Sequence, residues 1–153
     1  MLKTWLHFLE ELKSRKPLAD NELEITVFGK GYGECLLVSC GSNEFIVIDS
    51  FVNNYTKRPI ALDYLDAIGL DSKQIKQIVM THWHKDHIDG ISDILKVASS
   101  EAKLVISPII KIEKFLKYIA IGINEKVEST TEFNKVLGFM KRNLRRIVIP
   151  SPN

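Results

Sequence analysis

The sequence predicts a mixed α/β domain, of the α+β kind, in which helices pack against one sheet. Three short apolar segments separated by glycine-containing turns come first, and strand-like and helix-like segments then alternate. A meander followed by such an alternation is typical of a sheet covered by helices. With 153 residues, 45% of them hydrophobic, the chain is long enough for one domain with its own core.

The chain opens with an expected helix and a three-stranded meander. Apolar residues at helical spacing predict an amphipathic helix within residues 1–20, which we expect to dock on the domain of residues 21–153 or on a partner; they are Leu2, Trp5, Leu6, Leu9 and Leu12. The meander is predicted from runs of β-branched and aromatic residues. Its strands are expected at residues 23–28, 35–39 and 44–49.

The remaining elements alternate, and several carry end signals. They are expected at 58–70 (helix), 74–81 (strand), 91–98 (helix), 102–107 (strand), 109–121 (helix), 129–146 (helix) and 147–150 (strand). Gly69 is expected to stop the first helix, and Asp89 to cap the amino end of the second. Ser129 followed by Glu132 predicts a capping box for the last helix.

Composition limits the compartment and the partners. No apolar run reaches the roughly 18 residues of a membrane span. The amino terminus also lacks a signal-peptide pattern, so we expect a cytoplasmic protein that does not contact membranes. The two cysteines, Cys35 and Cys40, are spaced to lie on opposite faces of one strand. We expect both to be buried, reduced thiols.

Charge is distributed unevenly along the chain. Residues 1–100 contain 11 Lys/Arg and 14 Asp/Glu, whereas residues 101–153 contain 10 and 5. The basic residues are densest in a short stretch near the carboxyl end: Lys141, Arg142, Arg145 and Arg146. Such a stretch is either the solvated face of a helix or a contact for the phosphates of a nucleic acid.

Three of the four histidines lie within six residues, together with an aspartate. On an extended chain His82 and His84 project to the same side, and Asp86 and His87 follow after a turn. The segment therefore offers two pairs of ligands, which suit two metal ions about 3.5–4 Å apart. Nitrogen-rich ligation with a carboxylate favours zinc, with manganese or iron as alternatives.

The position of this segment favours an active site. It directly follows an apolar strand, and active sites of α/β sheets lie at the carboxyl ends of strands. Gly90, just behind it, would let the backbone pass close to the cleft. The other interpretations are a polar loop with histidines gathered by chance, and a closed structural zinc site, although such sites usually contain cysteines.

The segment His82-Trp83-His84-Lys85-Asp86-His87, after a strand ending in threonine, resembles the signature of the metallo-β-lactamase superfamily. "FIVIDS" resembles the strand that ends in that family's first aspartate, here Asp49. "ITVFGKGYGECLLV" resembles the opening hairpin of the branch that includes the C-terminal domain of the DNA-uptake competence channel protein. The resemblance covers residues 24–107 and implies an αββα sandwich and a water-activating metallohydrolase.

The resemblance also implies individual roles. His82 and His84 would hold the first metal ion, and Asp86 and His87 the second. Asp86 would be the catalytic residue, because it would also orient the attacking water and manage its proton. Asp49 would support the loop through hydrogen bonds without binding metal.

The chain departs from the family pattern in its second half. After His87 it has no histidine and after Asp93 no aspartate, although the family's later loops normally supply both. The remaining histidine, His7, lies in the expected leading helix. Three readings follow: the chain is the amino-terminal half of a larger hydrolase, a compact or degenerate member, or a chain whose missing ligands come from a partner or a second copy.

Two hypotheses for function follow from these residues. The first is a metal-dependent hydrolase with two metal ions, acting on a phosphodiester or nucleic acid, which the competence-protein resemblance and the basic carboxyl-terminal third favour. The second is a catalytically incomplete fragment or pseudoenzyme that acts as a binding or assembly module. Metal content and hydrolysis distinguish the two.

Overall fold

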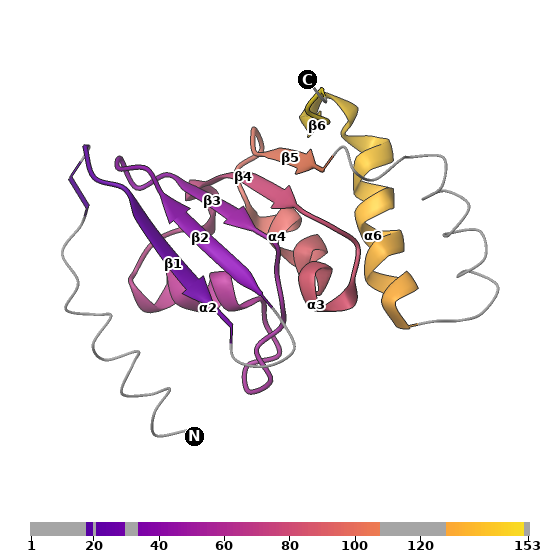
Figure 1. Ribbon diagram of the computed structural model, residues 1–153, viewed down its shortest axis with the longest axis horizontal. Helices are drawn as coiled ribbons and strands as arrows, with labels where there is room; N and C mark the ends of the chain where they lie inside the picture. Colours follow the sequence, from indigo (N-terminus) through magenta and orange to yellow (C-terminus); the bar gives the residue numbers. More distant parts are fainter. Residues whose placement is uncertain (1–17, 20, 30–33, 108–127, 152–153) are drawn as a thin grey trace.

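The described residues form one sheet with helices packed on it, which confirms the predicted mixed α/β class (Figure 1). The computed structural model describes residues 18–19, 21–29, 34–107 and 128–151, with only the backbone at 128–131. The strands are β1 (Glu24–Phe28), β2 (Cys35–Ser39), β3 (Phe45–Ile48), β4 (Ile75–Met80), β5 (Lys103–Ile106) and β6 (Ile147–Val148). The helices are α2 (Ile60–Ala67), α3 (Lys85–Ile88), α4 (Ile91–Val97) and α6 (Glu128–Arg142), with short 3-10 helices η1 (Ser72–Gln74) and η2 (Leu144–Arg146).

The strands follow one another across the sheet in chain order, from β1 to β6. β1, β2 and β3 are antiparallel, as expected of the meander, and β3 to β6 are parallel. Parallel neighbours need a crossover connection, and crossovers are almost always right-handed. Because the order always advances in the same direction, this rule places every crossover helix on the same face of the sheet.

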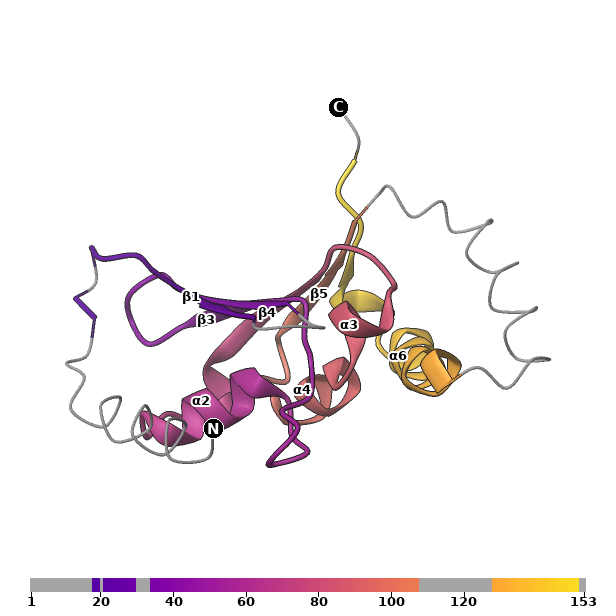
Figure 2. The same ribbon diagram turned by 60° about the horizontal axis from the view of Figure 1, so that its bottom comes forward.

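The helices do lie on one face. Figure 2 shows α2, α4 and α6 below the sheet, with no described helix above it. Burial alternates along the strands accordingly: Leu37 and Val47 are buried toward the helices, whereas the residues next to them in sequence are half-buried. The core therefore lies between this face and the helices, and its fully buried members include Leu65, Ile78, Ile94 and Val136.

Glycines end one helix and begin another. Gly69, at φ +73°, follows α2, and the amides of Gly69 and Leu70 donate to the carbonyls of Asp66 and Leu65, as in a Schellman motif. The predicted cap at Asp89 is wrong, because Gly90 (φ +84°) occupies the position before α4. A Cβ at Gly90 would lie 2.8 Å from the Pro59 side chain, so the close backbone approach expected there is present.

The predicted capping box of the last long helix is also wrong. α6 begins at Glu128, which places Ser129 inside the helix instead of before it. The Glu132 carboxylate accepts a hydrogen bond of 2.7 Å from the amide of Ser92, in the first turn of α4. The Glu132 carboxylate, which local sequence assigns to the amino end of α6, therefore binds Ser92 of α4 instead.

The helix expected at residues 109–121 lies outside the described residues, and so do residues 1–17 of the expected leading helix. The division at residue 20 is likewise a prediction that the structure leaves open. Within the ranges that are described, no helix has the length and apolar character needed to cross a membrane.

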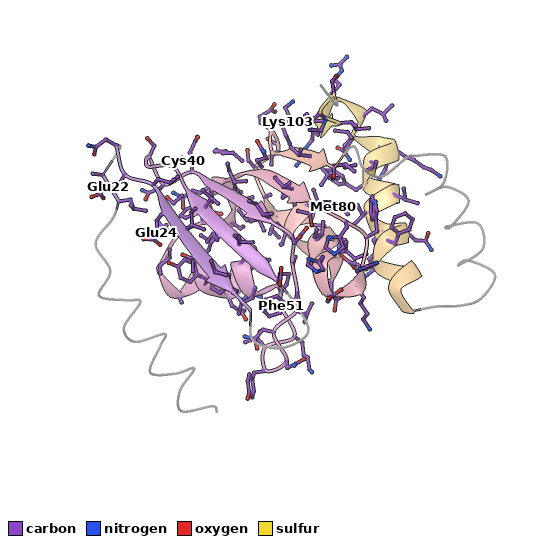
Figure 3. The ribbon with its side chains drawn as sticks, in the orientation of Figure 1. Glu22, Glu24, Cys40, Phe51, Met80 and Lys103 are labelled. Atoms are coloured by element: carbon purple, nitrogen blue, oxygen red, sulfur yellow. The ribbon has the colours of Figure 1, made fainter. Side chains whose placement is uncertain are left out.

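The two cysteines differ in their surroundings, and the prediction that both are buried is wrong for Cys40. Cys35 is fully buried in β2, whereas Cys40 lies just beyond that strand and is exposed; both are free thiols (Figure 3). Burial, with a smaller contribution from the charge of Asp49, raises the pKa of Cys35 to about 12. The Cys35 thiol is therefore protonated, and unreactive, at neutral pH.

We expect the folded chain to react with one equivalent of a thiol reagent at pH 8, at Cys40, and with two after denaturation. The ordinary pKa of the Cys35 thiol is 9.0 and its folded value is about 12, so this group stabilises the fold below pH 9 and the stabilisation is lost as pH rises toward 12. Titration of thiols in the native and the denatured chain measures the number of reactive cysteines in each state. The same titration of Cys40→Ser shows whether Cys35 reacts. Rapid native labelling of Cys40→Ser would contradict the burial of Cys35.

Candidate metal centre

The histidine segment leaves the sheet at the carboxyl end of β4, at Met80 (Figure 3). Thr81 to Trp83 form an irregular loop, His84 is extended at the start of α3, and α3 contains Asp86 and His87. The neighbouring strand β3 continues to this edge, where the Ser50 amide donates to the His87 carbonyl at 2.8 Å. The loop is therefore attached to two adjacent parallel strands.

A buried carboxylate connects these strands to the loop. Asp49 follows β3, is 4% exposed, and has a left-handed backbone with φ +55°. Its Oδ1 accepts from the Thr81 amide at 2.8 Å, and its Oδ2 accepts from the Thr81 hydroxyl and lies 3.0 Å from Nδ1 of His87. A buried carboxylate needs such donors, and the donors are thereby fixed in place.

The hydrogen bonds of Asp49 determine which nitrogen each histidine presents. A carboxylate can only accept, so His87 carries its hydrogen on Nδ1 and leaves the lone pair of Nε2 free. The Thr81 hydroxyl has one hydrogen, which it donates to Asp49, so at 2.8 Å it accepts from Nδ1 of His82. His82 thus also leaves Nε2 free, and both rings have the form that metal ligands require.

The three imidazoles lie together, with one pair closest. The ring centroids of His82 and His87 are 3.7 Å apart, and those of His82 and His84 are 4.9 Å apart. Ligand atoms of Asp49, His82 and His87 converge within 4.8 Å of one another, the one group of this kind among the residues that the structure describes. On the outer side, Oδ2 of Asp86 lies 3.6 Å from Nε2 of His87.

These side chains fit a metal ion. Two imidazoles with a free Nε2 lie with ring centroids 3.7 Å apart, and the third imidazole lies beside His82. The half-exposed carboxylate of Asp86 lies 3.6 Å from Nε2 of His87. The sequence pairs His82 with His84 and Asp86 with His87, whereas the structure brings His82 closest to His87, beside Asp49. The division of these ligands between two ions stays a prediction.

Helix α6 holds the loop from the side opposite the strands. The Trp83 ring packs edge-on against Phe133, with centroids 4.6 Å apart, and the adjacent Glu132 binds the Ser92 amide. Burial, and next the charge of Glu132, raises the pKa of Asp89 between these elements. Sequence reasoning missed Glu132 and Phe133, because nothing in the local pattern links residues 40 or more positions apart. It also left Thr81 without a role, although a hydroxyl next to a metal-binding histidine is a recognisable signal.

Comparison with known proteins identifies a family with a similar sequence. A family model described as "Metallo-beta-lactamase superfamily" matches residues 28–100, which contain the meander, Asp49 and the whole histidine segment. No curated protein matches the chain.

Two solved structures share the fold, and a third is less similar. A Thermotoga maritima protein classed with the metallo-β-lactamases is 17% identical, with a TM-score of 0.54, over 85% of this chain and 58% of that one. The hydrolase AbOPH of the β-lactamase superfamily is 16% identical, with a TM-score of 0.51, over 94% and 48%. The metallo-β-lactamase SMB-1, in complex with mercaptoacetic acid, is 22% identical, with a TM-score of 0.44, over 61% and 35%.

The fold is that of a metallo-β-lactamase-like domain. The family model matches less than half of the chain and shows a similarity to the metallo-β-lactamase superfamily over that part. The chain spans from about a third to about three fifths of the length of those three structures. The coverage agrees with the expectation of an incomplete αββα sandwich.

We expect Asp49→Ala and Thr81→Val each to weaken zinc binding by about 10–100-fold, the usual effect of losing a partner that orients a metal ligand. Thr81→Ser keeps the hydroxyl and should retain most of the affinity. Competition with a chromophoric chelator gives Kd, and circular dichroism shows whether the fold is kept. Equal zinc affinity in the wild type and in Asp49→Ala would contradict the supporting role.

Proposed function

We propose that the chain belongs to a metal-dependent hydrolase in which His82, His84, Asp86 and His87 hold the metal ions. The observation that carries the proposal is the hydrogen-bonded chain from Asp49, which leaves Nε2 free on both His82 and His87, whose ring centroids are 3.7 Å apart. The burial cost of the Asp49 carboxylate is offset by its hydrogen bonds, and a carboxylate that accepts the second ring N–H of a histidine is the usual support of a metal-binding imidazole. Zinc suits these donors best, with manganese or iron as the alternatives.

The residues of this chain supply the binding and orienting parts of the reaction. A bound zinc ion would lower the pKa of a coordinated water so that it can attack at neutral pH. His82, His84 and His87 would fix the position of that chemistry, and Asp49 would keep their rings from turning. Asp86, with its side chain 47% exposed, can face both a metal ion and the solvent, and would orient the attacking water and accept its proton.

The described residues supply only part of a two-metal site. In the described part of the chain, one group of side chains could hold a metal ion. It consists of Asp49, at the end of β3, with His82 and His87 of the histidine segment. Completion would need ligands from a further segment or from a second chain. Without those ligands, the alternative to a hydrolase is a binding or assembly module that has kept the histidine segment.

The proposed substrate is a phosphodiester or a nucleic acid. The resemblance to the competence-protein branch favours it, and so does the basic stretch around η2. In that stretch Lys141, Arg142 and Arg145 are exposed, whereas Arg146 donates to the carbonyls of Ala102 and Ser99 and stacks on a phenylalanine ring. We therefore restrict the contact to the first three and assign Arg146 a structural role. A cytoplasmic location is part of this proposal.

Metal content and turnover test the hydrolase. We expect zinc or manganese to bind, up to two equivalents where the site is completed, and a generic phosphodiester such as bis(p-nitrophenyl) phosphate to be hydrolysed. His84→Ala should abolish turnover, and Asp86→Ala should lower it by about 10²–10⁴-fold, the size of a general acid–base contribution. Because Asp86 is half-exposed, its replacement should change the free energy of unfolding by less than about 1 kcal/mol.

Asp93→Ala is the matched control, because it removes an exposed carboxylate that pairs with Lys96 and lies outside the metal site. It should leave turnover unchanged. Less than one equivalent of metal and no turnover in a folded sample would reject the enzyme for this chain and favour the binding module.

Nucleic-acid contact predicts a charge-dependent affinity. The pair Lys141→Glu and Arg145→Glu should weaken binding of single-stranded DNA by at least about tenfold near 50 mM salt, and should flatten the salt dependence, because fewer counterions are released. Fluorescence anisotropy measures both. Lys57→Glu with Lys76→Glu makes the same change in charge at exposed positions elsewhere. If both double variants lost the same amount of DNA affinity, the effect would come from the change in net charge and not from contact at Lys141 and Arg145.

A further inference from the structure

The histidine segment is fastened to the strands by Asp49, but that support does not reach all three imidazoles. The Asp49 carboxylate accepts from the Thr81 hydroxyl and lies 3.0 Å from Nδ1 of His87, and through Thr81 it also orients His82. No described residue forms a hydrogen bond with the ring of His84, whose exposed imidazole lies beside that of His82, with centroids 4.9 Å apart. The direction of the His84 ring therefore depends on another support.

Helix α6 provides a support on the other side of the segment. It lies beside α3 in both ribbon views (Figure 1, Figure 2). Trp83 stands between two of the histidines, and its ring packs edge-on against that of Phe133, with centroids 4.6 Å apart. Consecutive side chains of an extended segment point to opposite sides, so a Trp83 that faces α6 leaves its neighbours facing away from it. His84 has an extended backbone (φ −77°, ψ 146°), and its ring does lie next to that of His82.

Phe133 is itself held firmly. Its side chain is 6% exposed, and Val136, one turn further along the same helix, is fully buried. Near the amino end of α6 the Glu132 carboxylate accepts a hydrogen bond of 2.7 Å from the Ser92 amide. Beyond the carboxyl end, the Arg146 guanidinium donates to two backbone carbonyls of the connection before β5. Because both ends of the helix are tied to other elements, Phe133 keeps its position relative to the histidine segment.

We propose that Phe133 is a positioning residue for the metal centre and acts through Trp83 on the ring of His84. This role rests on the metal site proposed above. Asp49 selects the tautomers of two imidazoles, whereas Phe133 selects the direction of the third. Without the contact the segment adopts more arrangements, and the fraction of molecules whose ligands converge falls. The apparent Kd for a metal ion rises by the inverse of that fraction.

The histidine rings of the metal-free chain test this role directly. Long-range ¹H–¹⁵N spectra at pH 8 show which ring nitrogen carries the hydrogen and how each ring is surrounded. In Phe133→Ala the signals of the His84 ring should lose the shift that the neighbouring His82 ring causes. The signals of His87 should stay as they are, because Asp49 still holds that ring.

Phe139→Ala is the matched control. It removes an aromatic ring from the same helix, but this ring packs under the guanidinium of Arg146, at 4.8 Å from the centroid, and not against the histidine segment. It should leave all three histidine rings and the zinc affinity unchanged. A purely structural role of Phe133 would lower the thermal stability in both variants and would change neither the ring signals nor the zinc affinity.

Zinc affinity is the second readout. Competition with a chromophoric chelator should give Phe133→Ala a Kd about 3–10-fold above that of the wild type, the range expected for the loss of one aromatic contact. Phe133→Leu keeps an apolar side chain against Trp83 and should restore most of the affinity. In a Trp83→Ala background, Phe133→Ala should cause no further loss, because the contact has already been removed.

A second pair of variants covers the case in which Phe133→Ala does not fold. Phe133 is buried, and the loss of a buried phenylalanine can unfold a chain of ordinary stability, which circular dichroism would show. Trp83 is only partly buried, so its variants replace Phe133→Ala in that case. Trp83→Phe keeps a ring against Phe133 and should retain the His84 signals and the zinc affinity of the wild type. Trp83→Ala should lose both.

Two results would overturn the positioning role. The first is a folded Phe133→Ala, or Trp83→Ala in its place, in which either the His84 signals or the zinc Kd equals that of the wild type. The second is an equal change in Phe139→Ala, which would show a general effect of destabilising α6. A wild type that binds no zinc would reject the proposed metal centre, and the ring signals of the metal-free chain would still decide the role of Phe133.

Discussion

The buried carboxylate of Asp49 is the interaction on which the candidate site depends. It joins the end of β3 to the end of β4 through Thr81, and both strands to α3 through His87. Because a carboxylate only accepts, its position fixes the hydrogen of His87 and, through the Thr81 hydroxyl, that of His82. The tautomers of two candidate ligands are thus set by one residue. Its left-handed backbone, with φ +55°, adds local strain that the three donors offset.

The strand order determines what surrounds that site. With parallel strands added in chain order, the crossover helices gather on one face, and α6 reaches the metal loop through Phe133 and Glu132. The other face carries no described helix (Figure 2). The position of the site and the open face therefore both follow from one topological rule.

Local pattern predicted the elements well where a single segment decides the outcome. Runs of β-branched residues predicted all six described strands, and Gly69 ends α2 as expected. Local pattern failed where a distant residue decides. Gly90, and not Asp89, precedes α4, where a Cβ would lie 2.8 Å from the Pro59 side chain. The carboxylate of Glu132, within α6, binds the Ser92 amide of another helix. Cys40 is exposed because β2 ends one residue earlier.

The sequence by itself determined the α/β class and the loop that carries three histidines and Asp86, because period, turns and ligand spacing are local properties. It also indicated Asp49 as a partner of that loop through a resemblance. Only the tertiary structure decided that His82 lies closest to His87, that Thr81 relays the hydrogen bond, and that one face of the sheet lacks a described cover. The relay and the open face depend on which strands become neighbours, because Asp49 lies 32 positions before Thr81 in the sequence. The closeness of His82 and His87 depends on the turn into α3, which ligand spacing alone does not fix.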